Sequence, residues 1–586
     1  MAASGVRARA RRAWLGVGLA LALGVTIGPA VAVDQARGRP PAAADLLEEK
    51  LHHAHPAGLA APAAQVAENF EVLGHVGFGR LDTNGDVFAH DGFAYVGTWA
   101  DPCTARGVKI VDVGNPRQPR FVGTLGGRPG TSAEDMVVRD VSTTRFAGDL
   151  LAVGIQRCGS APRLNRQRFG VQFWDVTDPM RPVRLSELSM SDGQGGVHEL
   201  DLFQRGDRVF ALLATPFTEW FDPQRDGDFR IVDVTDPRNP RQVGQWGARA
   251  HRLSRGPLSG QGSFGARFDH SVRASEDGLR AYVSYWDLGV LTLDISDVAR
   301  PRLVTRTRYG RFADGDAHSV SVYQAGERTL LLQNDEDFDP RSPVAVRVRG
   351  AVAGVGTESP TAPALWRRTG HGVSGRVVPA TRQGCRATDY PRRANGAVVV
   401  VRTRFSLLPS RRFVPACSQG RQERMAQRAG AVAVVHAFRS PDSSPQWFTT
   451  TRVRVPVVFT RAAVAMRMVR AGRGRLQARP PSWGFLRVYD ARTGRQVAAF
   501  DDVPNMHRLP APAGEWTVHN NEVVGDRSYV SWYANGIVAL DLRPLNQARP
   551  QAPVRVGRFV PPGRPRVWGV AVDDGGLVYA SDMVSG

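Results

Sequence analysis

The sequence predicts a mostly β protein: a seven-bladed β-propeller of four-stranded blades, with an α/β domain inserted into the fifth blade. Two observations lead to this prediction. A short apolar strand that ends in aspartate recurs six times along the chain, and in the first four copies it is followed by a turn and a proline-led strand. The copies are evenly spaced except at one place, where about 135 additional residues intervene, which is the size of a domain.

The repeated unit is clearest in FWDVTDPMRPVRL (173–185) and IVDVTDPRNPRQVG (231–244). Aspartate followed by proline favours a tight type I turn. The second proline of each unit has no N–H to donate, so the strand that it opens suits the outer edge of a sheet. Another pair of short apolar strands precedes each copy, which makes four strands per unit, as in a propeller blade. The strand-ending acids are Asp112, Asp175, Asp233, Asp294, Asp490 and Asp541.

The spacing of these acids places the insertion. Their successive separations are 63, 58, 61, 196 and 51 residues, and only the fourth is long enough to contain a domain. The additional residues must follow the strand that ends at Phe338 and precede the strand that begins at Trp483. We therefore expect the propeller at 69–340 (blades 1–5) and 483–586 (blades 5–7), and the inserted domain at 341–482.

The last unit is incomplete. It begins at Val567, contains two strands and stops before the aspartate-ended one. The segment FEVLGHVGF (70–78) is similar to the outer strands of other units. We expect it to pair with the last blade and close the ring, although one strand of that blade is still missing.

The N-terminus predicts export. Residues 1–32 combine four arginines, an apolar run and an Ala30-Val31-Ala32 cleavage site, as in a secretory signal; an uncleaved membrane anchor is the alternative. Residues 33–68, rich in alanine and proline, form an expected linker. After cleavage no apolar segment is long enough to span a bilayer, so we expect a secreted or cell-surface protein. We also expect it to be a monomer.

Charge and cysteine content narrow the functional classes. The formal charge of the chain is +21. The arginines of the chain are scattered along the sequence and do not form a stripe with aromatic residues, which argues against a nucleic-acid site. An even number of cysteines in an exported chain predicts two disulfides. Of the three possible connectivities, we favour Cys103–Cys158, whose members occupy matching places in successive repeats, and Cys385–Cys417, which both lie in the insertion.

The repeats resemble the LVIVD-repeat family of extracellular propellers, through IVDVTDPRNP and its relatives and through SYWDLGVLTLDISD (283–296). That family implies a propeller on bacterial surfaces, without a common activity. The insertion resembles a protease-associated (PA) domain, through GCRATDYP (384–391), AVVVV (397–401), AQRAGAVAVV (426–435) and VPVVF (455–459). PA domains are lids or peptide-binding modules without catalytic residues of their own.

Four histidines occupy the same place in successive units, just before the innermost strand: His198, His270, His318 and His519. The innermost strands of a propeller line its channel, so these imidazoles could converge there as metal ligands. Asp86, Asp135 and Trp568 stand at this place in other units. The alternative is that each histidine bonds the neighbouring blade and only joins the blades together.

A divalent metal, calcium or zinc, is therefore a possible cofactor. Oxygen ligands for calcium could come from two acidic groups, Asp335, Glu336, Asp337 and Asp339 at the start of the insertion, and Asp222, Asp226 and Asp228 in the third unit. Such groups are also common in solvated turns.

Two catalytic motifs are missing from the sequence: G-x-S-x-G, which marks a serine nucleophile, and H-E-x-x-H, which marks a zinc protease. We therefore assign no catalytic residue. The first hypothesis is therefore a binding or scaffold protein whose propeller face and PA-like module hold an extracellular protein, a peptide or a wall polymer. The second is a metal-dependent hydrolase or lyase with its site in the propeller funnel and the PA-like domain as a lid. Convergence of the four imidazoles on one point would favour the second.

Overall fold

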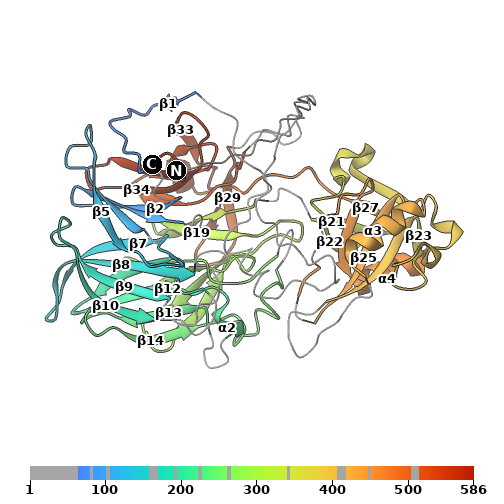
Figure 1. The fold of residues 1–586 in the computed structure, drawn as a ribbon, viewed down its shortest axis with the longest axis horizontal. Helices are drawn as coiled ribbons and strands as arrows, with labels where there is room; N and C mark the ends of the chain where they lie inside the picture. Colours follow the sequence, from blue (N-terminus) through green and yellow to red (C-terminus); the bar gives the residue numbers. More distant parts are fainter. Residues whose placement is uncertain are drawn as a thin grey trace, which may run out of the picture.

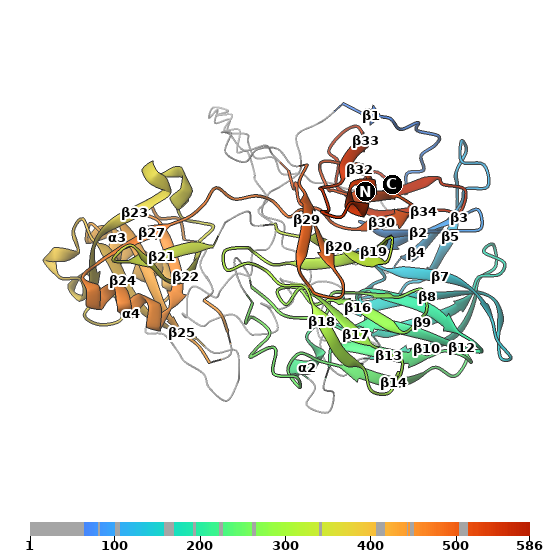
Figure 2. The same ribbon diagram turned by 180° about the vertical axis from the view of Figure 1, so that it is seen from behind.

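The computed structural model describes residues 64–79, 83–99, 106–157, 169–190, 195–221, 227–260, 265–338, 343–405, 417–441, 443–445, 451–502 and 514–586. It consists of a ring of β-sheets and, beside it, a smaller β-barrel that carries two helices (Figures 1 and 2). The predicted mostly β propeller arrangement is thus confirmed.

Six sheets of the ring contain four antiparallel strands each, which follow one another in chain order from the innermost strand outward, and we call them blades 1 to 6. Blade 1 has β2 (Asn84–His90), β3 (Phe93–Thr98), β4 (Gly107–Asp112) and β5 (Arg120–Gly126). Blade 2 has β7 (Met136–Ser142), β8 (Ala147–Arg157), β9 (Gly170–Asp175) and β10 (Val183–Ser189), and β6 (Thr131–Ser132) also pairs with β8. Blade 3 has β11 (Leu200–Arg205), β12 (Arg208–Ala214), β13 (Phe229–Asp233) and β14 (Arg241–Trp246).

The second half of the ring repeats this pattern. Blade 4 has β15 (Ser271–Ala274), β16 (Arg280–Ser284), β17 (Val290–Asp294) and β18 (Arg302–Arg306). Blade 5 has β19 (Ala317–Ala325), β20 (Arg328–Asp335), β28 (Leu486–Asp490) and β29 (Gln496–Phe500). Blade 6 has β30 (Asn521–Val524), β31 (Arg527–Ser531), β32 (Ile537–Asp541) and β33 (Val554–Val560). A two-stranded sheet follows, with β34 (Val567–Val572) and β35 (Val578–Asp582).

All six predicted strand-ending acids are the last residues of the third strands. Their carboxylates stabilise the turns that follow. Asp175 Oδ1 accepts hydrogen bonds from the backbone N–H and the hydroxyl of Thr177, at 3.0 and 2.7 Å, and Asp233 does the same with Thr235. The repeated aspartate is therefore a turn-forming residue and has no part in the site.

The innermost strands β2, β7, β11, β15, β19, β30 and β34 contact one another in this order, and β34 also contacts β2. The ring is therefore closed, with the two-stranded sheet between blade 6 and blade 1. Seven blades were predicted, the last of them short of one strand. The described residues contain six four-stranded blades, because β34 and β35 have no third and fourth partner strands.

The predicted strand at 70–78 is wrong. The N-terminal strand is β1 (Val66–Glu68), and it pairs antiparallel with β33 as an outer fifth strand of blade 6, at the end of the expected linker. Residues 70–78 instead lie against the last sheet without strand pairing: His75 Nε2 is 3.0 Å from the carbonyl oxygen of Ser585, and Val76 and Phe78 pack in a cluster with Ala571. Apolar packing, rather than a backbone ladder, thus joins the two ends.

The barrel is formed by the chain between β20 and β28, the second and third strands of blade 5. Its strand order is β21-β22-β26-β25-β24-β23-β27, closed on itself, and β23 to β26 are parallel neighbours. The strands are β21 (Val344–Val348), β22 (Ala351–Glu358), β23 (Gly372–Pro379), β24 (Val398–Arg404), β25 (Ala433–Arg439), β26 (Val457–Arg461) and β27 (Arg473–Gln477).

Helices α3 (Gln419–Arg428) and α4 (Ala462–Ala471) cover the barrel. Four short 3₁₀ helices lie in its connections: η1 (Leu365–Arg367), η2 (Thr369–His371), η3 (Ala387–Asp389) and η4 (Arg392–Ala394). The propeller contributes α2 (Thr218–Phe221) and η6 (Arg543–Asn546). Cys385 and Cys417 form the predicted disulfide, which joins the η3 region to the start of α3. Cys103 and Cys158 lie outside the described residues, so their pairing stays a prediction.

Candidate metal centre

In a four-stranded antiparallel blade, the first strand begins, the second ends and the third begins at the same end of the ring. We call this end of the ring the mouth. Each of the four predicted histidines lies where an innermost strand begins: His198 before β11, His270 before β15, His318 in β19 and His519 before β30. The barrel interrupts blade 5 between its second and third strands, so it leaves the propeller at the same mouth.

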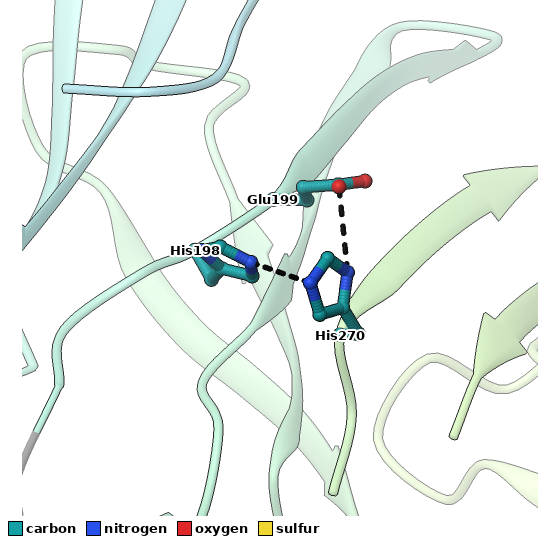
Figure 3. Close-up of side chains that lie close together, drawn as sticks. All are labelled: His198, Glu199 and His270. Atoms are coloured by element: carbon teal, nitrogen blue, oxygen red, sulfur yellow. Dashed lines mark hydrogen bonds and ion pairs between the residues drawn. The ribbon is translucent and has the colours of Figure 1, made fainter. Parts of the chain in front are cut away.

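The four imidazoles form a continuous row across blades 3 to 6. Successive ring centroids are 4.2, 4.0 and 4.1 Å apart. His198 Nε2 lies 2.8 Å from His270 Nε2, and Figure 3 shows the two rings pointing toward each other. None of the four side chains is more than 1% exposed. The histidines converge, as the sequence suggested, and they do so away from water.

Three glutamates lie beside the row of imidazoles. Glu134 Oε2 is 2.9 Å from His198 Nδ1. Glu199 Oε1 is 3.4 Å from His270 Nδ1, as Figure 3 shows. Glu336, which directly follows β20, lies 3.5 Å from His318 Nε2 and 3.7 Å from His519 Nε2. Each glutamate therefore stands beside one or two imidazoles.

Among the described residues, three groups of three side chains bring their donor atoms within 4.8 Å of one another. One, made of His90, Asp91 and Asp149, lies outside the row and is partly exposed. The two in the row are His198, Glu199 and His270, and His270, His318 and Glu336. His270 belongs to both groups and is therefore the central residue of the row. We call His198, Glu199, His270, His318, Glu336 and His519 together the mouth centre.

Aromatic residues complete the circle opposite the histidines. The ring of Trp568, which stands at the start of β34, lies 4.2 Å from that of His519, and the ring of Trp99 lies 5.1 Å from that of Trp568 and 5.9 Å from that of His198. Tyr533 donates its hydroxyl to Glu336 Oε1 at 2.6 Å. The mouth centre is thus enclosed by imidazoles on one side and by indoles and a phenol on the other.

Asp86 and Asp135 belong to the same acidic environment. Asp86 Oδ1 accepts a hydrogen bond from Asn520 Nδ2 at 2.7 Å, and Asp135 Oδ2 accepts one from Leu200 N at 2.8 Å. Burial raises the pKa of Asp135 to about 7, and burial followed by the charges of neighbouring carboxylates raises the pKa of Asp86 and of Glu199. Burial likewise raises the pKa of Glu336. A cation held among these groups would oppose such shifts, because it favours the ionised carboxylates.

The donor chemistry favours zinc over calcium. Imidazole suits zinc, copper, iron and nickel, whereas calcium takes oxygen ligands. Two of the acids considered for calcium have other roles. Asp335 pairs with Arg487 and accepts the hydroxyl of Tyr309, and Asp228 accepts the N–H groups of Phe217 and Glu219 at the start of α2. Asp222, Asp226 and Asp339 lie outside the described residues.

A second group of buried acids lies beside the mouth centre. Glu219 and Asp228 are fully buried; Glu219 Oε1 accepts the hydroxyl of Tyr285 at 3.0 Å and Glu219 Oε2 accepts Arg249 N at 2.9 Å. Burial, and then Asp228, raises the pKa of Glu219 to about 8, and burial raises the pKa of Asp228 to about 7. These two carboxyl groups therefore hold protons in the folded state at pH values where an exposed acid is ionised.

This difference predicts a pH dependence of stability. The unfolded chain loses the Glu219 proton near 4.5 and the folded chain near 8, so the free energy of unfolding should fall as the pH rises between these values. In Glu219→Gln, which stays neutral, the fall should be shallower than in the wild type, as measured by urea denaturation from about pH 5 to pH 8. The exposed Glu276→Gln is the control and should keep the wild-type slope; an unchanged slope in Glu219→Gln would contradict the prediction.

Sequence reasoning missed Glu134, and it discussed Glu199 and Glu336 only in other contexts. Glu199 follows His198 directly, but Leu202 stands where H-E-x-x-H requires a second histidine, so no motif marked it; Glu336 was grouped with the calcium candidates. Glu134 immediately precedes Asp135, which stands at the repeat position of the histidines. An acidic residue directly beside the repeated histidine position is the sequence signal that could have identified Glu134 and Glu199.

Comparison with known proteins supports the class of fold. The family model of the LVIVD repeat matches residues 84–125 and 272–308, which correspond to blade 1 and to most of blade 4. The protein is thus a β-propeller with LVIVD repeats. No curated protein matches the chain.

Several solved structures are similar at low identity. The computationally designed Ika8 protein is 8% identical, over 87% of this chain and 96% of that one, with a TM-score of 0.34. The β-propeller domain of Cps50 (Swd1) from Myceliophteria thermophila is 14% identical, over 50% of this chain and 70% of that one, with a TM-score of 0.28. The zinc aminopeptidase BSAP from Bacillus subtilis is 14% identical, over 29% of this chain and 36% of that one, with a TM-score of 0.20. With TM-scores below 0.5, these similarities carry no argument about activity.

None of the helices in the described part of the chain is long and apolar enough to cross a membrane.

Proposed function

We propose that the protein is an extracytoplasmic metalloprotein whose mouth centre binds one divalent first-row transition ion, zinc by preference, and that it acts as a metal-dependent hydrolase or lyase. The observation that carries this proposal is the meeting of four imidazoles from four successive blades with Glu199 and Glu336. Each histidine stands on a different blade, so no local feature of the chain requires them to touch.

Electrostatics support a bound cation. Burying several carboxylates together is costly unless positive charge compensates them. Arg273 is one source of compensation, since its charge lowers the pKa of Asp86 and of Asp135, and its own closest partner is Glu522. A divalent ion at His270 would compensate the remainder, because the donor atoms of both triples lie around that residue.

The residues suggest a division of tasks. A bound zinc ion supplies Lewis-acid chemistry and lowers the pKa of coordinated water. Glu199 and Glu336 lie close enough to the imidazoles to take or return a proton, and Tyr533 orients Glu336. Trp99 and Trp568 close the opposite side and exclude water.

The proposal includes an interpretation of two parts of the fold, the two-stranded sheet and the barrel. We take the two-stranded sheet as a seventh, incomplete blade and the barrel as a PA-like domain that acts as a lid. The predicted N-terminal signal and the disulfide Cys385–Cys417 support an oxidising compartment outside the cytoplasm.

The second candidate function is a binding or scaffold protein, with the barrel and the propeller mouth holding a peptide, a protein or a wall polymer. A propeller with LVIVD repeats is compatible with this role. The full burial of the four histidines favours it in one respect, since a large substrate has no direct path to them.

Metal content separates the two candidates. The mature protein, purified without a histidine tag, should contain about one equivalent of zinc or another first-row ion, should lose it to a chelator, and should regain thermal stability when zinc is returned. Protein that stays metal-free after incubation with zinc, and whose melting temperature does not respond to it, would remove the metalloprotein proposal and leave the binding role.

A further inference from the structure

A group of close donor atoms also lies at the end of the ring opposite the mouth. It contains His90, the last residue of β2, Asp91 in the turn to β3, and Asp149 near the start of β8. His90 Nε2 lies 2.9 Å from Asp149 Oδ1 and 3.8 Å from Asp91 Oδ2. The three donor atoms all lie within 4.8 Å of one another. The group therefore brings blade 1 and blade 2 together, and we call it the far-end group.

The backbone sets the positions of both acids. Asp91 and Gly92 form the two-residue turn between β2 and β3, with φ values of 43° and 76°, as in a tight type I′ hairpin. Asp149 is held in β8, where its N–H donates to the hydroxyl of Thr177 at 3.0 Å and its carbonyl oxygen accepts the N–H of Val176 at 2.9 Å. The two carboxylates thus face the imidazole as a prearranged set, which is what a metal site requires.

A third carboxylate stands beside this group. Asp140 of β7 is directly opposite Asp149 of β8 in the register of blade 2. Acids directly opposite each other repel and destabilise an antiparallel pair. Among the described residues, neither an arginine nor a lysine forms an ion pair with Asp91, Asp140 or Asp149; only His90 does so. A divalent cation at the far-end group would relieve this repulsion, because it attracts all three carboxylates.

The buried hydroxyl of Tyr95 is a second, independent observation. Tyr95 of β3 is directly opposite Phe88 of β2, and side chains alternate along a strand, so Tyr95 shares with His90 the face of blade 1 that packs on blade 2. Its side chain is fully buried, and its hydroxyl has no hydrogen-bond partner among the described residues. Burial, and then the charges of Asp149 and Asp91, raise the pKa of Tyr95. A water molecule coordinated to an ion at the far-end group can bond this hydroxyl, which is otherwise costly to bury.

We propose that His90, Asp91 and Asp149 bind a divalent manganese ion at the far end of the ring, with water in the remaining coordination positions. Carboxylate and water ligands suit manganese, whereas calcium and magnesium take oxygen ligands and do not favour the imidazole of His90. The ion enters from solvent, since the side chain of Asp91 is 76% exposed. It joins blade 1 to blade 2, because it takes ligands from both. The site stands independently of the mouth centre and of the proposed function.

A manganese titration of the full mature protein, followed by the electron paramagnetic resonance signal of the free ion, tests the site. His90→Gln should bind one equivalent less than the wild type, however many ions the mouth centre takes up. Asp91→Asn removes one charged ligand but keeps the turn, since asparagine also tolerates positive φ. Its affinity should fall at least about tenfold, which is the cost of losing even a supporting residue of a metal site. Glu276→Gln, at an exposed acid in the β15–β16 turn at the same end of the ring, is the matched control and should bind as the wild type does.

A variant of the mouth centre and a second readout separate the outcomes. His270→Gln should keep the manganese equivalent that His90→Gln loses, so failure at one centre is distinguishable from failure at the other. Manganese should raise the melting temperature of His90→Gln less than that of the wild type, because an ion shared by two blades stabilises the folded state. If His90→Gln bound as many equivalents as the wild type, His90 and Asp149 would form only an ion pair and the proposal would be overturned. A wild type that binds no manganese, or equal losses of affinity in Asp91→Asn and Glu276→Gln, would overturn it as well.

Discussion

Replacement of His270 by alanine is expected to abolish metal binding at the mouth centre while the propeller stays folded. His270 is the only residue that belongs to both groups of close donor atoms, and its neighbours in the row lie on either side of it. Removal of a ligand of this kind should lower the affinity for zinc by at least about a hundredfold, because loss of a mere supporting residue already costs ten- to a hundredfold. Metal content by mass spectrometry and a zinc titration measure the effect.

Two further variants make this result interpretable. His371→Ala removes an exposed histidine of the barrel and should keep a full equivalent of metal. His270→Ala leaves a cavity, whereas His270→Gln preserves much of the side-chain volume. If both variants lose the metal, the loss is therefore not caused by the cavity. If His270→Ala unfolded at lower denaturant while its zinc affinity stayed unchanged, the histidines would serve only to join the blades.

Trp568→Ala is expected to destabilise the whole ring. The indole is fully buried at the start of β34 and contacts Trp99 of blade 1 as well as His519 and Tyr533 of blade 6. Truncation of a buried tryptophan costs about 4 kcal/mol in the free energy of unfolding. Trp568 joins the two-stranded sheet to both neighbouring blades, so this loss should appear as the opening of the contact between blade 6 and blade 1.

Guanidinium denaturation followed by fluorescence gives the free energy, and hydrogen exchange of β2 and β30 locates the opening. Val584→Ala, a change at an exposed residue two positions after β35, is the control and should remain within about 0.5 kcal/mol of the wild type. A Trp568→Ala protein as stable as this control would mean that the last sheet does not hold the ring together.

Much of the architecture was predictable because it follows from local chemistry. An aspartate at the end of a short apolar strand forms the turn by itself, as Asp175 does with Thr177, so each copy can be recognised without its neighbours. The distance between Asp294 and Asp490 therefore revealed the insertion. The short apolar segments AVVVV and VPVVF likewise predicted strands that became β24 and β26.

The N-terminal segment shows the limit of such reasoning. Residues 70–78 have the composition of an outer strand, yet β1 pairs with β33 four residues earlier in the chain, and His75 and Phe78 contact the last sheet through side chains. Strand composition does not specify which of two free sheet edges a strand selects, because both offer the same backbone groups.

The sequence by itself determined the repeated unit, its turn residues, the place of the insertion and the recurrence of a histidine before four innermost strands, since each depends on residues close together in the chain. Only the tertiary structure decided that His198, His270, His318 and His519 lie side by side, and that Glu134 and Glu336 join them. These contacts form between different blades and depend on how the blades pack around a common axis. The sequence of a single repeat therefore does not specify them.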